Sequence, residues 1–121
     1  MIDKNIRIAV AGASGRMGKT LIKLILQNDY QVKLGAAIVS NYSKYNNIDV
    51  SKLVCLPTPV GILTTNNINL VSNKFDVLID FTNPSASIEN IKKCCKYNKN
   101  IVIGTTGFSK AQKKIIKKKV E

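Results

Sequence analysis

Three glycines near the N-terminus are the residues whose type and spacing point most directly to chemistry. Gly12, Gly15 and Gly18 follow an apolar run, and a helical pattern begins among them. The first turn of a helix offers unpaired N–H groups and a positive dipole end, which attract a pyrophosphate when Gly12 and Gly15 let it approach. Gly18 is expected to let the helix pack close to the strand. Arg16 adds a cation and Ser14 adds a hydroxyl donor. The stretch therefore predicts a dinucleotide-binding turn, with an ordinary strand-to-helix turn as the alternative, because the spacing differs from the common G-x-G-x-x-G.

Two later segments also place polar residues after apolar runs. They are Asp80–Asn83 and Gly104–Gly107. Ligands of an open parallel α/β sheet bind beyond the carboxyl ends of its strands, so both segments are expected to meet Gly12–Met17 at one edge. A tight turn before a helix is the alternative for Gly104–Gly107. For Asp80 the alternative is a buried carboxylate capped by backbone N–H groups, and we assign it no catalytic role.

The elements that would position these segments alternate along the chain. Strands are predicted at Ile6–Ala11, Gln31–Val39, Val60–Thr65 (short), Phe75–Phe81 and Asn100–Gly104. Helices are predicted at Gly15–Gln27, at Pro84–Tyr97 and from Ser109 onward, and a weak helix is predicted within Asn66–Ser72. This order predicts an α/β fold, a doubly wound, mostly parallel Rossmann-type sheet with helices on both faces. The length suits a single dinucleotide-binding domain over residues 1–121.

Side-chain periodicity predicts which residues are buried and where helices begin. The expected inward sets are Val32, Leu34, Ala36 and Ile38 on the second strand, Met17, Leu21, Leu24 and Ile25 on the first helix, and Ile88, Ile91 and Cys95 on the second. Asn83 and Ser109 are predicted N-caps, and Pro84 suits the first helical position.

The net charge of +12 raises the possibility of a nucleic-acid partner, and lysines are concentrated from Lys92 to Lys119. However, lysine, asparagine and isoleucine are frequent along the whole chain, and no aromatic residues alternate with these lysines. We therefore interpret the basic C-terminal region as a solvated helix face and predict no nucleic-acid partner. We also hypothesise that this face attracts an anionic cofactor.

The remaining composition excludes several other classes of protein. Cys55, Cys94 and Cys95 form neither a disulfide framework nor a metal motif, so we predict no metal site and a reducing, cytoplasmic location. No apolar run is long enough to span a membrane, which needs about 20 residues. The first residues lack the apolar core of a signal peptide.

The end of the second predicted strand bears on the choice of cofactor. A dinucleotide site usually places an Asp or Glu there, which accepts hydrogen bonds from the adenosine ribose. This chain has Val39 and Ser40 at that point. Because a carboxylate would repel a ribose phosphate, its absence is compatible with NADPH. We hypothesise that Ser40, Asn41 and Lys44 donate to that phosphate.

Three motifs in order resemble one enzyme family. Ala-Gly-Ala-Ser-Gly-Arg-Met-Gly at 11–18, Ile-Asp-Phe-Thr-Asn-Pro at 79–84 and Val-Ile-Gly-Thr-Thr-Gly-Phe at 102–108 are similar to segments of 4-hydroxy-tetrahydrodipicolinate reductases. The resemblance runs from Asn5 to the last helix and covers the family's N-terminal, cofactor-binding part.

This resemblance implies a reaction and a set of site residues. The reaction is the NADPH- or NADH-dependent reduction of a cyclic dicarboxylate imine, the dehydrated form of hydroxytetrahydrodipicolinate, to tetrahydrodipicolinate in lysine and diaminopimelate biosynthesis. The pyrophosphate side of the cofactor would be held by Gly12, Ala13, Ser14, Gly15, Arg16 and Met17, and the nicotinamide side by Gly104, Thr105 and Thr106, with Thr106 near a substrate carboxylate.

The resemblance also implies that the family's catalytic residues lie outside the part that this chain resembles. The family's catalytic histidines, lysine and Ser-Gly-Thr lie in a later substrate-binding domain, and this chain contains no histidine. We therefore assign no catalytic residue here and expect the isolated chain to be inactive. The alternative is a truncated, non-catalytic nucleotide-binding module. The family resemblance suggests a homo-oligomer.

Overall fold

The structure is a computed structural model of the 121-residue chain, and it describes residues 6–27 and 32–120. Its elements run in the order β1 (Ile6–Ala11), α1 (Arg16–Leu26), β2 (Val32–Ile38), α2 (Val50–Leu53), the 3-10 helix η1 (Ile68–Lys74), β3 (Val77–Asp80), α3 (Pro84–Lys96), β4 (Asn100–Ile103) and α4 (Lys110–Val120). Four of the five predicted strands and the main helices are present, with ends shifted by one or a few residues, and the exception is Val60–Thr65. The predicted start of the second strand, Gln31, lies outside the described residues.

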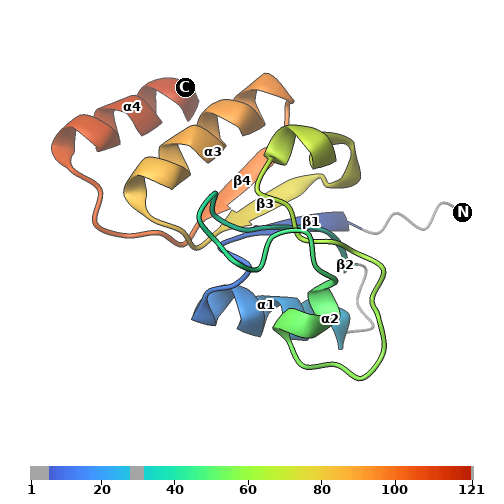
Figure 1. The fold of residues 1–121 in the computed structure, drawn as a ribbon. Helices are drawn as coiled ribbons and strands as arrows, with labels where there is room; N and C mark the ends of the chain where they lie inside the picture. The colour runs from blue at the N-terminus through green and yellow to red at the C-terminus, as the bar shows by residue number, and fades with distance from the viewer. Residues whose placement is uncertain (1–5, 28–31, 121) are drawn as a thin grey trace, which may run out of the picture.

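The four strands form one parallel sheet in the order β2-β1-β3-β4. The chain moves from β1 to β2 on one side, and then returns to the other side of β1 to build β3 and β4 (Figure 1). The direction of winding therefore reverses between β1 and β3. In sheets of this kind ligands bind outside the carboxyl ends of the strands at that reversal.

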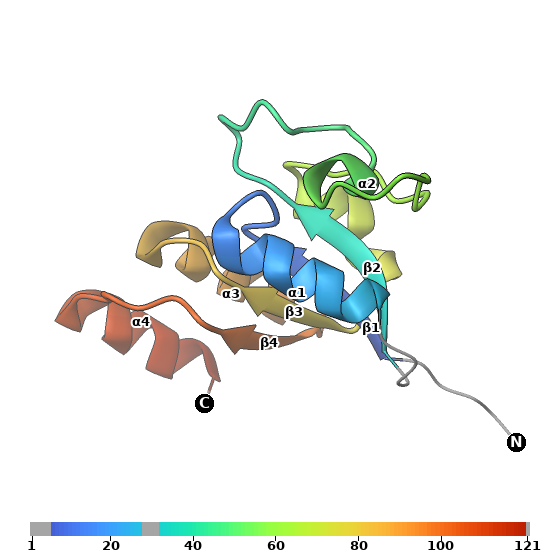
Figure 2. The ribbon, with the colours of Figure 1, turned by 90° about the horizontal axis from the view of Figure 1, so that it is seen from below.

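Helices cover both faces of the sheet, which confirms the predicted doubly wound α/β architecture. In Figure 1, α1 and α2 lie below the sheet, whereas η1, α3 and α4 lie above it, and Figure 2 shows α1 crossing in front of the strands. The central strand β1 is buried on both faces, with Ala9, Val10 and Ala11 at most 1% exposed. Small and β-branched residues suit a strand that helices cover on both sides.

The sheet separates two apolar cores. The core on the α1 side contains Val10, Ala13, Ile22, Ile25, Leu34, Ala37, Val39, Val50, Leu53 and Val54. The core on the α3 side contains Ala9, Ala11, Ala36, Ile38, Ile68, Val71, Phe75, Leu78 and Cys94.

The predicted simple alternation along the second strand is wrong. Ile8 pairs with Leu34 but the next residue of β1, Ala9, pairs with Ala36, so Gly35 is an extra residue in β2. Leu34 consequently faces the α1-side core, whereas Ala36 faces the α3-side core. Such a bulge reverses the side-chain alternation beyond it.

The predicted inward faces of α1 and α3 are each partly wrong. On α1, Met17 and Leu24 are 54% and 56% exposed, and the buried positions are Gly18, Ile22 and Ile25. The helix packs through the face that carries Gly18, because a residue without a side chain allows the closest approach.

On α3, Ile88 and Ile91 are buried as predicted, but Cys94 is buried instead of Cys95, which is exposed. Ser87 is also fully buried, and its hydroxyl donates to the Thr105 hydroxyl in the loop after β4. The inward face of α3 therefore includes a polar residue. Burial raises the pKa of the Cys94 thiol to about 11.

The predicted short strand at Val60–Thr65 is also wrong. Only Thr65 pairs with the sheet, where its N–H donates to the Ala37 carbonyl at 3.0 Å. The preceding residues pair instead with the segment before α2, as in the hydrogen bond from Thr64 N–H to the Ile48 carbonyl at 2.8 Å. The weak helix predicted within Asn66–Ser72 is the 3-10 helix η1, which continues to Lys74.

The Asp49 carboxylate joins the start of α2 to the backbone of Val60 and Gly61. Its oxygens accept hydrogen bonds from the N–H groups of Ser51, Val60 and Gly61, each at 2.9 Å. These backbone donors hold the pKa of the Asp49 carboxyl well below its usual range. The irregular segment between β2 and η1 therefore has a fixed course, and it borders the carboxyl edge of β2.

Candidate nucleotide-binding cleft

A cleft of about 700 Å³ lies at the carboxyl edge of the sheet, where the winding reverses. This volume is within the range of ligand-binding pockets. Its walls come from the loop after β1 (Gly12, Ser14, Gly15), the segment after β2 (Val39, Ser40, Asn41, Tyr42), Asn66 and Ile68, and the β3–α3 connection with the first turns of α3 (Phe81, Thr82, Asn83, Ser85, Ala86, Glu89, Asn90, Lys93).

The loop after β1 is held against the end of β2 by backbone hydrogen bonds. The N–H groups of Gly12 and Ala13 both donate to the Ile38 carbonyl, at 3.0 and 3.1 Å. Gly12 has φ of +82°, and a side chain there would overlap the Phe81 carbonyl. The loop therefore crosses β3 at a distance that only glycine permits.

Gly18 brings α1 against this loop. A side chain at Gly18 would overlap the Gly12 carbonyl, so the first turn of α1 lies directly on the end of β1. The prediction that Gly18 permits close packing of the helix is confirmed. This contact fixes the direction in which the N-terminus of α1 faces.

The N-terminus of α1 has no side-chain cap. Its N-cap residue is Gly15, which has no side-chain acceptor, and the first turn contains no acidic residue. The Lys19 N–H donates to the Gly15 carbonyl at 3.0 Å, so the N–H groups of Arg16 and Met17 precede the first intrahelical bond. Because Gly12, Ser14 and Gly15 line the cleft, the positive end of the α1 dipole lies at its wall.

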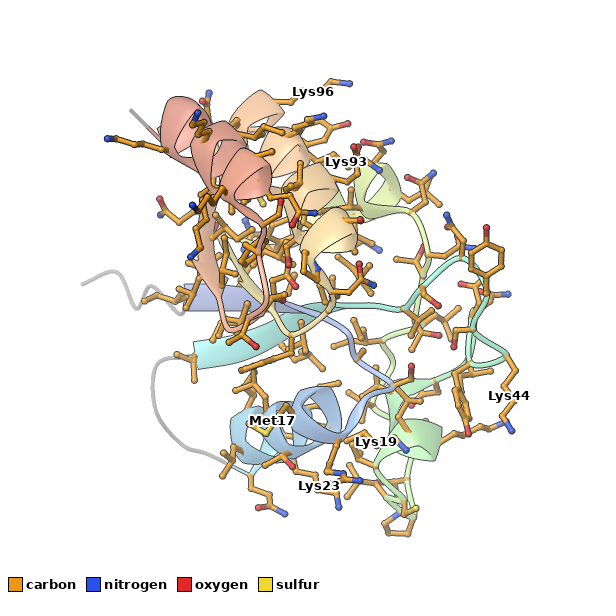
Figure 3. The ribbon with its side chains drawn as sticks, turned by 90° about the vertical axis from the view of Figure 1, so that its left-hand side faces the viewer. Met17, Lys19, Lys23, Lys44, Lys93 and Lys96 are labelled. Carbon is orange, nitrogen blue, oxygen red and sulfur yellow. The ribbon has the colours of Figure 1, made fainter. Side chains whose placement is uncertain are left out.

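The structure divides the residues predicted for the first loop into two groups. Gly12, Ser14 and Gly15 line the cleft. Ala13 is fully buried in the core on the α1 side, and it supports the loop from below. Arg16 and Met17 are exposed at the start of α1, outside the lining (Figure 3 labels Met17).

Asp80 forms a buried polar cluster at the end of β3. Its side chain is fully buried, which confirms the burial expected in the alternative given for Asp80, but the expected capping by backbone N–H groups is limited to one donor, the Thr82 N–H, and the other donors are side chains. Oδ1 accepts from the Thr82 N–H at 2.9 Å, the Thr82 hydroxyl at 2.6 Å and the Thr105 hydroxyl at 3.2 Å, while Oδ2 accepts from the Asn90 side-chain amide at 3.0 Å. The carboxylate thus joins β3, α3 and the loop after β4.

Thr105 is bound within this cluster. Besides donating to Asp80, its hydroxyl oxygen accepts from the Ser87 hydroxyl at 2.8 Å and the Thr82 N–H at 3.1 Å. Gly104 packs against the ring of Phe81. The predicted residues Gly104, Thr105 and Thr106 therefore lie outside the cleft lining. Gly104 and Thr105 contact Phe81 and Thr82, which both belong to that lining.

The N-terminus of α3 is capped by its own chain. The Asn83 side chain accepts from the Ala86 N–H at 3.0 Å, and Pro84 is the first helical residue. Both predictions are confirmed, as is the cap at Ser109, whose hydroxyl accepts from the Gln112 N–H at 3.1 Å. In each case the capping residue and its partner lie three residues apart in sequence.

Sequence reasoning missed the wall that α3 contributes. Ser85, Ala86, Glu89, Asn90 and Lys93 recur every three or four residues, on the side of α3 that faces the cleft. That periodicity is the signal that would have identified them. Tyr42, Asn66 and Ile68 were also missed, because they line the cleft only through the fold of the segment between β2 and η1.

Two further observations concern other kinds of site. Residues 6–27 and 32–120 contain no group of three or more His, Cys, Asp or Glu side chains placed to hold a metal ion. Within the same ranges, no helix has the length and apolar character needed to cross a membrane.

A family model and the curated relatives identify the same family. Residues 6–121 match the family model described as dihydrodipicolinate reductase, N-terminus. The chain is 45% identical over 116 residues to the 4-hydroxy-tetrahydrodipicolinate reductase of Buchnera aphidicola subsp. Acyrthosiphon pisum (strain Tuc7), a match that covers 96% of this chain and 42% of that protein. The chain thus spans less than half the length of the curated relatives it matches.

Solved structures give the same result for the fold. Dihydrodipicolinate reductase from Paenisporosarcina sp. TG-14, solved with dipicolinate bound, superposes with a TM-score of 0.69 at 28% identity, covering 96% of this chain and 43% of that one. Amine dehydrogenase from Mycobacterium smegmatis superposes with a TM-score of 0.68 at 19% identity, covering 82% of this chain and 29% of that one, which shows a shared fold.

Proposed function

Because the chain belongs to the dihydrodipicolinate reductase family, matching its N-terminal region, we propose that it is the cofactor-binding part of an NAD(P)H-dependent 4-hydroxy-tetrahydrodipicolinate reductase. The reaction is the reduction of a cyclic dicarboxylate imine to tetrahydrodipicolinate. When bound, the nicotinamide supplies the hydride. The residues of this chain bind and orient the cofactor.

The uncapped N-terminus of α1 at the cleft wall is the observation that carries this proposal. A pyrophosphate needs several donors at short range, and helix N–H groups together with the helix dipole supply them. Gly15 leaves these donors without a side-chain acceptor. Gly12 and Gly18 place the turn so tightly that a Cβ at either position would overlap backbone atoms. The donor set and the shape of the loop both fit a dinucleotide.

The segments around the N-terminus of α1 suit different parts of the cofactor. The segment after β2 and the first turns of α3 would hold the adenosine half. The loop after β4, with Gly104, Thr105 and Thr106, would adjoin the nicotinamide, and Thr106 would lie near a substrate carboxylate. The Asp80 cluster would fix that loop relative to the cleft, because Thr105 is one of its members.

No catalytic residue is assigned within this chain. Reduction of an imine requires a proton donor beside the substrate, and the sequence contains no histidine. More than half of the relatives' length lies outside the matched region. We infer that the substrate-binding domain corresponds to that part of the relatives and that residues 1–121 constitute the dinucleotide-binding domain.

The same observations favour a second candidate, a nucleotide-binding module that binds cofactor without turnover. Titration of the 121-residue chain with NADPH and NADH, followed by nicotinamide fluorescence, tests the binding that both candidates share. We expect saturable binding of the cofactor, and we expect ADP to inhibit that binding competitively. Absence of binding to either cofactor, by a chain with a cooperative melting transition, would refute both.

Turnover distinguishes the two candidates. The protein as its own cell makes it should oxidise NADPH in the presence of the imine if the reductase function holds. Binding without turnover in that material would favour the module. The same material tests two further parts of the proposal, a cytoplasmic location by cell fractionation and a homo-oligomer by light scattering.

A further inference from the structure

The loop after β4 is held at its first two residues by Asp80. The Gly104 N–H donates to the Asp80 backbone carbonyl at 2.8 Å, and the Thr105 hydroxyl donates to the Asp80 carboxylate at 3.2 Å. Further along the loop, Thr106 is exposed, and a Cβ at Gly107 would meet no atom within 4 Å. The main chain and the side chain of one residue of β3 therefore fix the place where this loop begins.

The Asp80 carboxylate is buried among neutral donors that come from three segments. It accepts four hydrogen bonds, from the N–H and hydroxyl of Thr82, the Asn90 amide and the Thr105 hydroxyl. The ion pairs among the described residues involve the other carboxylates Asp76 and Glu89. A buried carboxylate is costly unless its hydrogen bonds are all formed, so this cluster favours a single arrangement of the three segments.

The Thr105 hydroxyl has no hydrogen-bonding capacity left for a ligand. It donates to Asp80, and its oxygen accepts from the Ser87 hydroxyl at 2.8 Å and from the Thr82 N–H at 3.1 Å. A hydroxyl group has one proton to donate and two lone pairs that accept. All three are used inside the cluster, so the side chain of Thr105 holds the loop in place and leaves only its backbone to face a cofactor.

This cluster lies directly behind the wall of the cleft. Phe81, Thr82 and Asn90 line the cleft, whereas Asp80 is fully buried and lies outside the lining. A Cβ at Gly104 would overlap atoms of the Phe81 ring, so the loop after β4 packs closely against that wall. In Figure 1, the ribbon that leaves β4 toward α4 passes the start of α3. Asp80 can therefore affect a ligand in the cleft only through its neighbours.

We propose that Asp80 is a positioning residue for the nicotinamide half of the cofactor, which it orients by holding Gly104 and Thr105 against the β3–α3 connection. This inference rests on the proposed cofactor-binding function. Hydride transfer depends on the orientation of the ring that gives the hydride, and a loop with one fixed place supplies a fixed surface for that ring. The cluster includes no residue of α1 or of the loop after β1, so it acts on the nicotinamide half alone.

Thr105→Val tests this role, because it removes the hydroxyl and keeps the shape of the side chain. The 121-residue chain is titrated with NADPH or NADH, whichever binds more tightly, and with ADP, which lacks the nicotinamide. We expect Thr105→Val to weaken binding of the reduced cofactor about fivefold and to change ADP binding less than about twofold. The fluorescence of the bound nicotinamide should also shift toward that of the free cofactor. Thr105→Ser, which keeps the hydroxyl, should restore both readouts.

Thr64→Val is the matched control, because it also removes a buried threonine hydroxyl. Thr64 is 2% exposed, and its hydroxyl oxygen accepts from the Ile48 N–H at 3.1 Å in the segment between β2 and η1. This variant should lower the melting temperature as Thr105→Val does. The ratio of cofactor affinity to ADP affinity and the fluorescence of the bound nicotinamide should stay at the parent values, which separates positioning from a general loss of stability.

Ser87→Ala is a milder second variant that serves if Thr105→Val does not fold. It leaves all four hydrogen bonds to the Asp80 carboxylate in place, and it should change the same two readouts in the same direction by a smaller amount.

Two results would overturn this inference while the cofactor site stands. One is an equal loss of cofactor and ADP affinity in Thr105→Val, or in Ser87→Ala where that variant replaces it. The other is bound-nicotinamide fluorescence that does not differ from the parent chain's in that variant. Failure of the parent chain to bind either cofactor would instead count against the proposed function.

Discussion

Helices α1 and α3 both begin at the carboxyl edge of the sheet and both border the cleft, but their N-termini are completed differently. In α3, the Asn83 side chain accepts from the Ala86 N–H, and buried Ser87 joins the Asp80 cluster. In α1, the N-cap is Gly15, without any side-chain acceptor. One helix start is satisfied by its own chain, and the other presents its donors at the cleft wall.

This difference indicates that ligand binding and fold stability depend on different helix N-termini in this molecule. A helix N-terminus capped by its own side chain has fewer unpaired N–H groups for a ligand. An uncapped N-terminus keeps those donors, so a bound anion stabilises it more. The α1 side is fixed by close backbone packing at Gly12 and Gly18, which needs no polar side chain. The α3 side is fixed by side-chain hydrogen bonds. The following substitutions test that division, from the largest expected effect to the smallest.

Removing the carboxylate of the α3 side should have the largest effect. Asp80→Ala would leave Thr82, Asn90 and Thr105 without their shared acceptor, and we expect the free energy of unfolding to fall by about 3 kcal/mol. Urea denaturation measures this change. Asp80→Asn, which keeps the size and one acceptor oxygen, should cost less. A loss under about 1 kcal/mol for Asp80→Ala would show that the cluster does not hold this side together.

Capping α1 artificially should weaken cofactor binding and leave the fold intact. Gly15→Asp would supply the missing acceptor and a negative charge where the pyrophosphate is proposed to bind, with an expected affinity loss of about 2–3 kcal/mol. The melting temperature should change little, since Gly15 has ordinary extended dihedrals, φ −80° and ψ 172°, and the new side-chain cap offsets the close approach of a Cβ to the Gly12 carbonyl oxygen at 3.3 Å. Isothermal titration with NADPH measures the affinity.

Ser109→Asp is the matched control for that experiment. It places the same charge at the N-cap of α4, away from the cleft, and should leave NADPH affinity unchanged. Unchanged affinity in Gly15→Asp would contradict the placement of the pyrophosphate at α1.

Uncapping α3 should have the opposite profile. Asn83→Ala removes the acceptor for the Ala86 N–H and should lower the free energy of unfolding by about 1 kcal/mol. Asn83 lines the cleft but is not assigned to the pyrophosphate, so NADPH affinity should fall much less than in Gly15→Asp. Asn83→Asp, which keeps the cap, should restore stability. A large loss of affinity with unchanged stability in Asn83→Ala would reverse the roles given to the two helices.

The smallest effect on stability is expected for the exposed ion pair between Arg7 and Asp76, at the opposite edge of the sheet. Hydrogen bonds from Arg7 lower the pKa of Asp76 to about 2. Since the folded-state pKa lies below the unfolded value, about 3.9, the stabilisation is present above pH 4 and is lost as the pH falls through 2.

Acid unfolding of Asp76→Asn against the parent chain checks this prediction. The stability difference should be small at neutral pH, because both side chains are more than 40% exposed, and it should vanish near pH 2. A difference that grows as the pH falls below 4 would contradict the ion pair.

Sequence reasoning succeeded where the interacting residues are neighbours in the chain. The strand Ile6–Ala11, the caps at Asn83 and Ser109, and the close approach at Gly18 each depend on residues within about two turns. The carboxyl edge was also predictable, because parallel strands bring their ends together. Periodicity failed for Met17, Leu24 and Cys95, since it defines an apolar face only to within one residue of rotation.

The sequence by itself therefore determined the succession of strands and helices, the glycine turn that begins α1, and the family. Tertiary structure alone decided the bulge at Gly35, the hydrogen bond from Thr105 to Asp80, and the placement of the Lys19 ammonium beside the Tyr45 ring. The physical reason is separation along the chain: Asp80 and Thr105 are 25 residues apart. Residue spacing predicts contacts within a helix or strand, but contacts between distant segments depend on how the sheet and its helices pack.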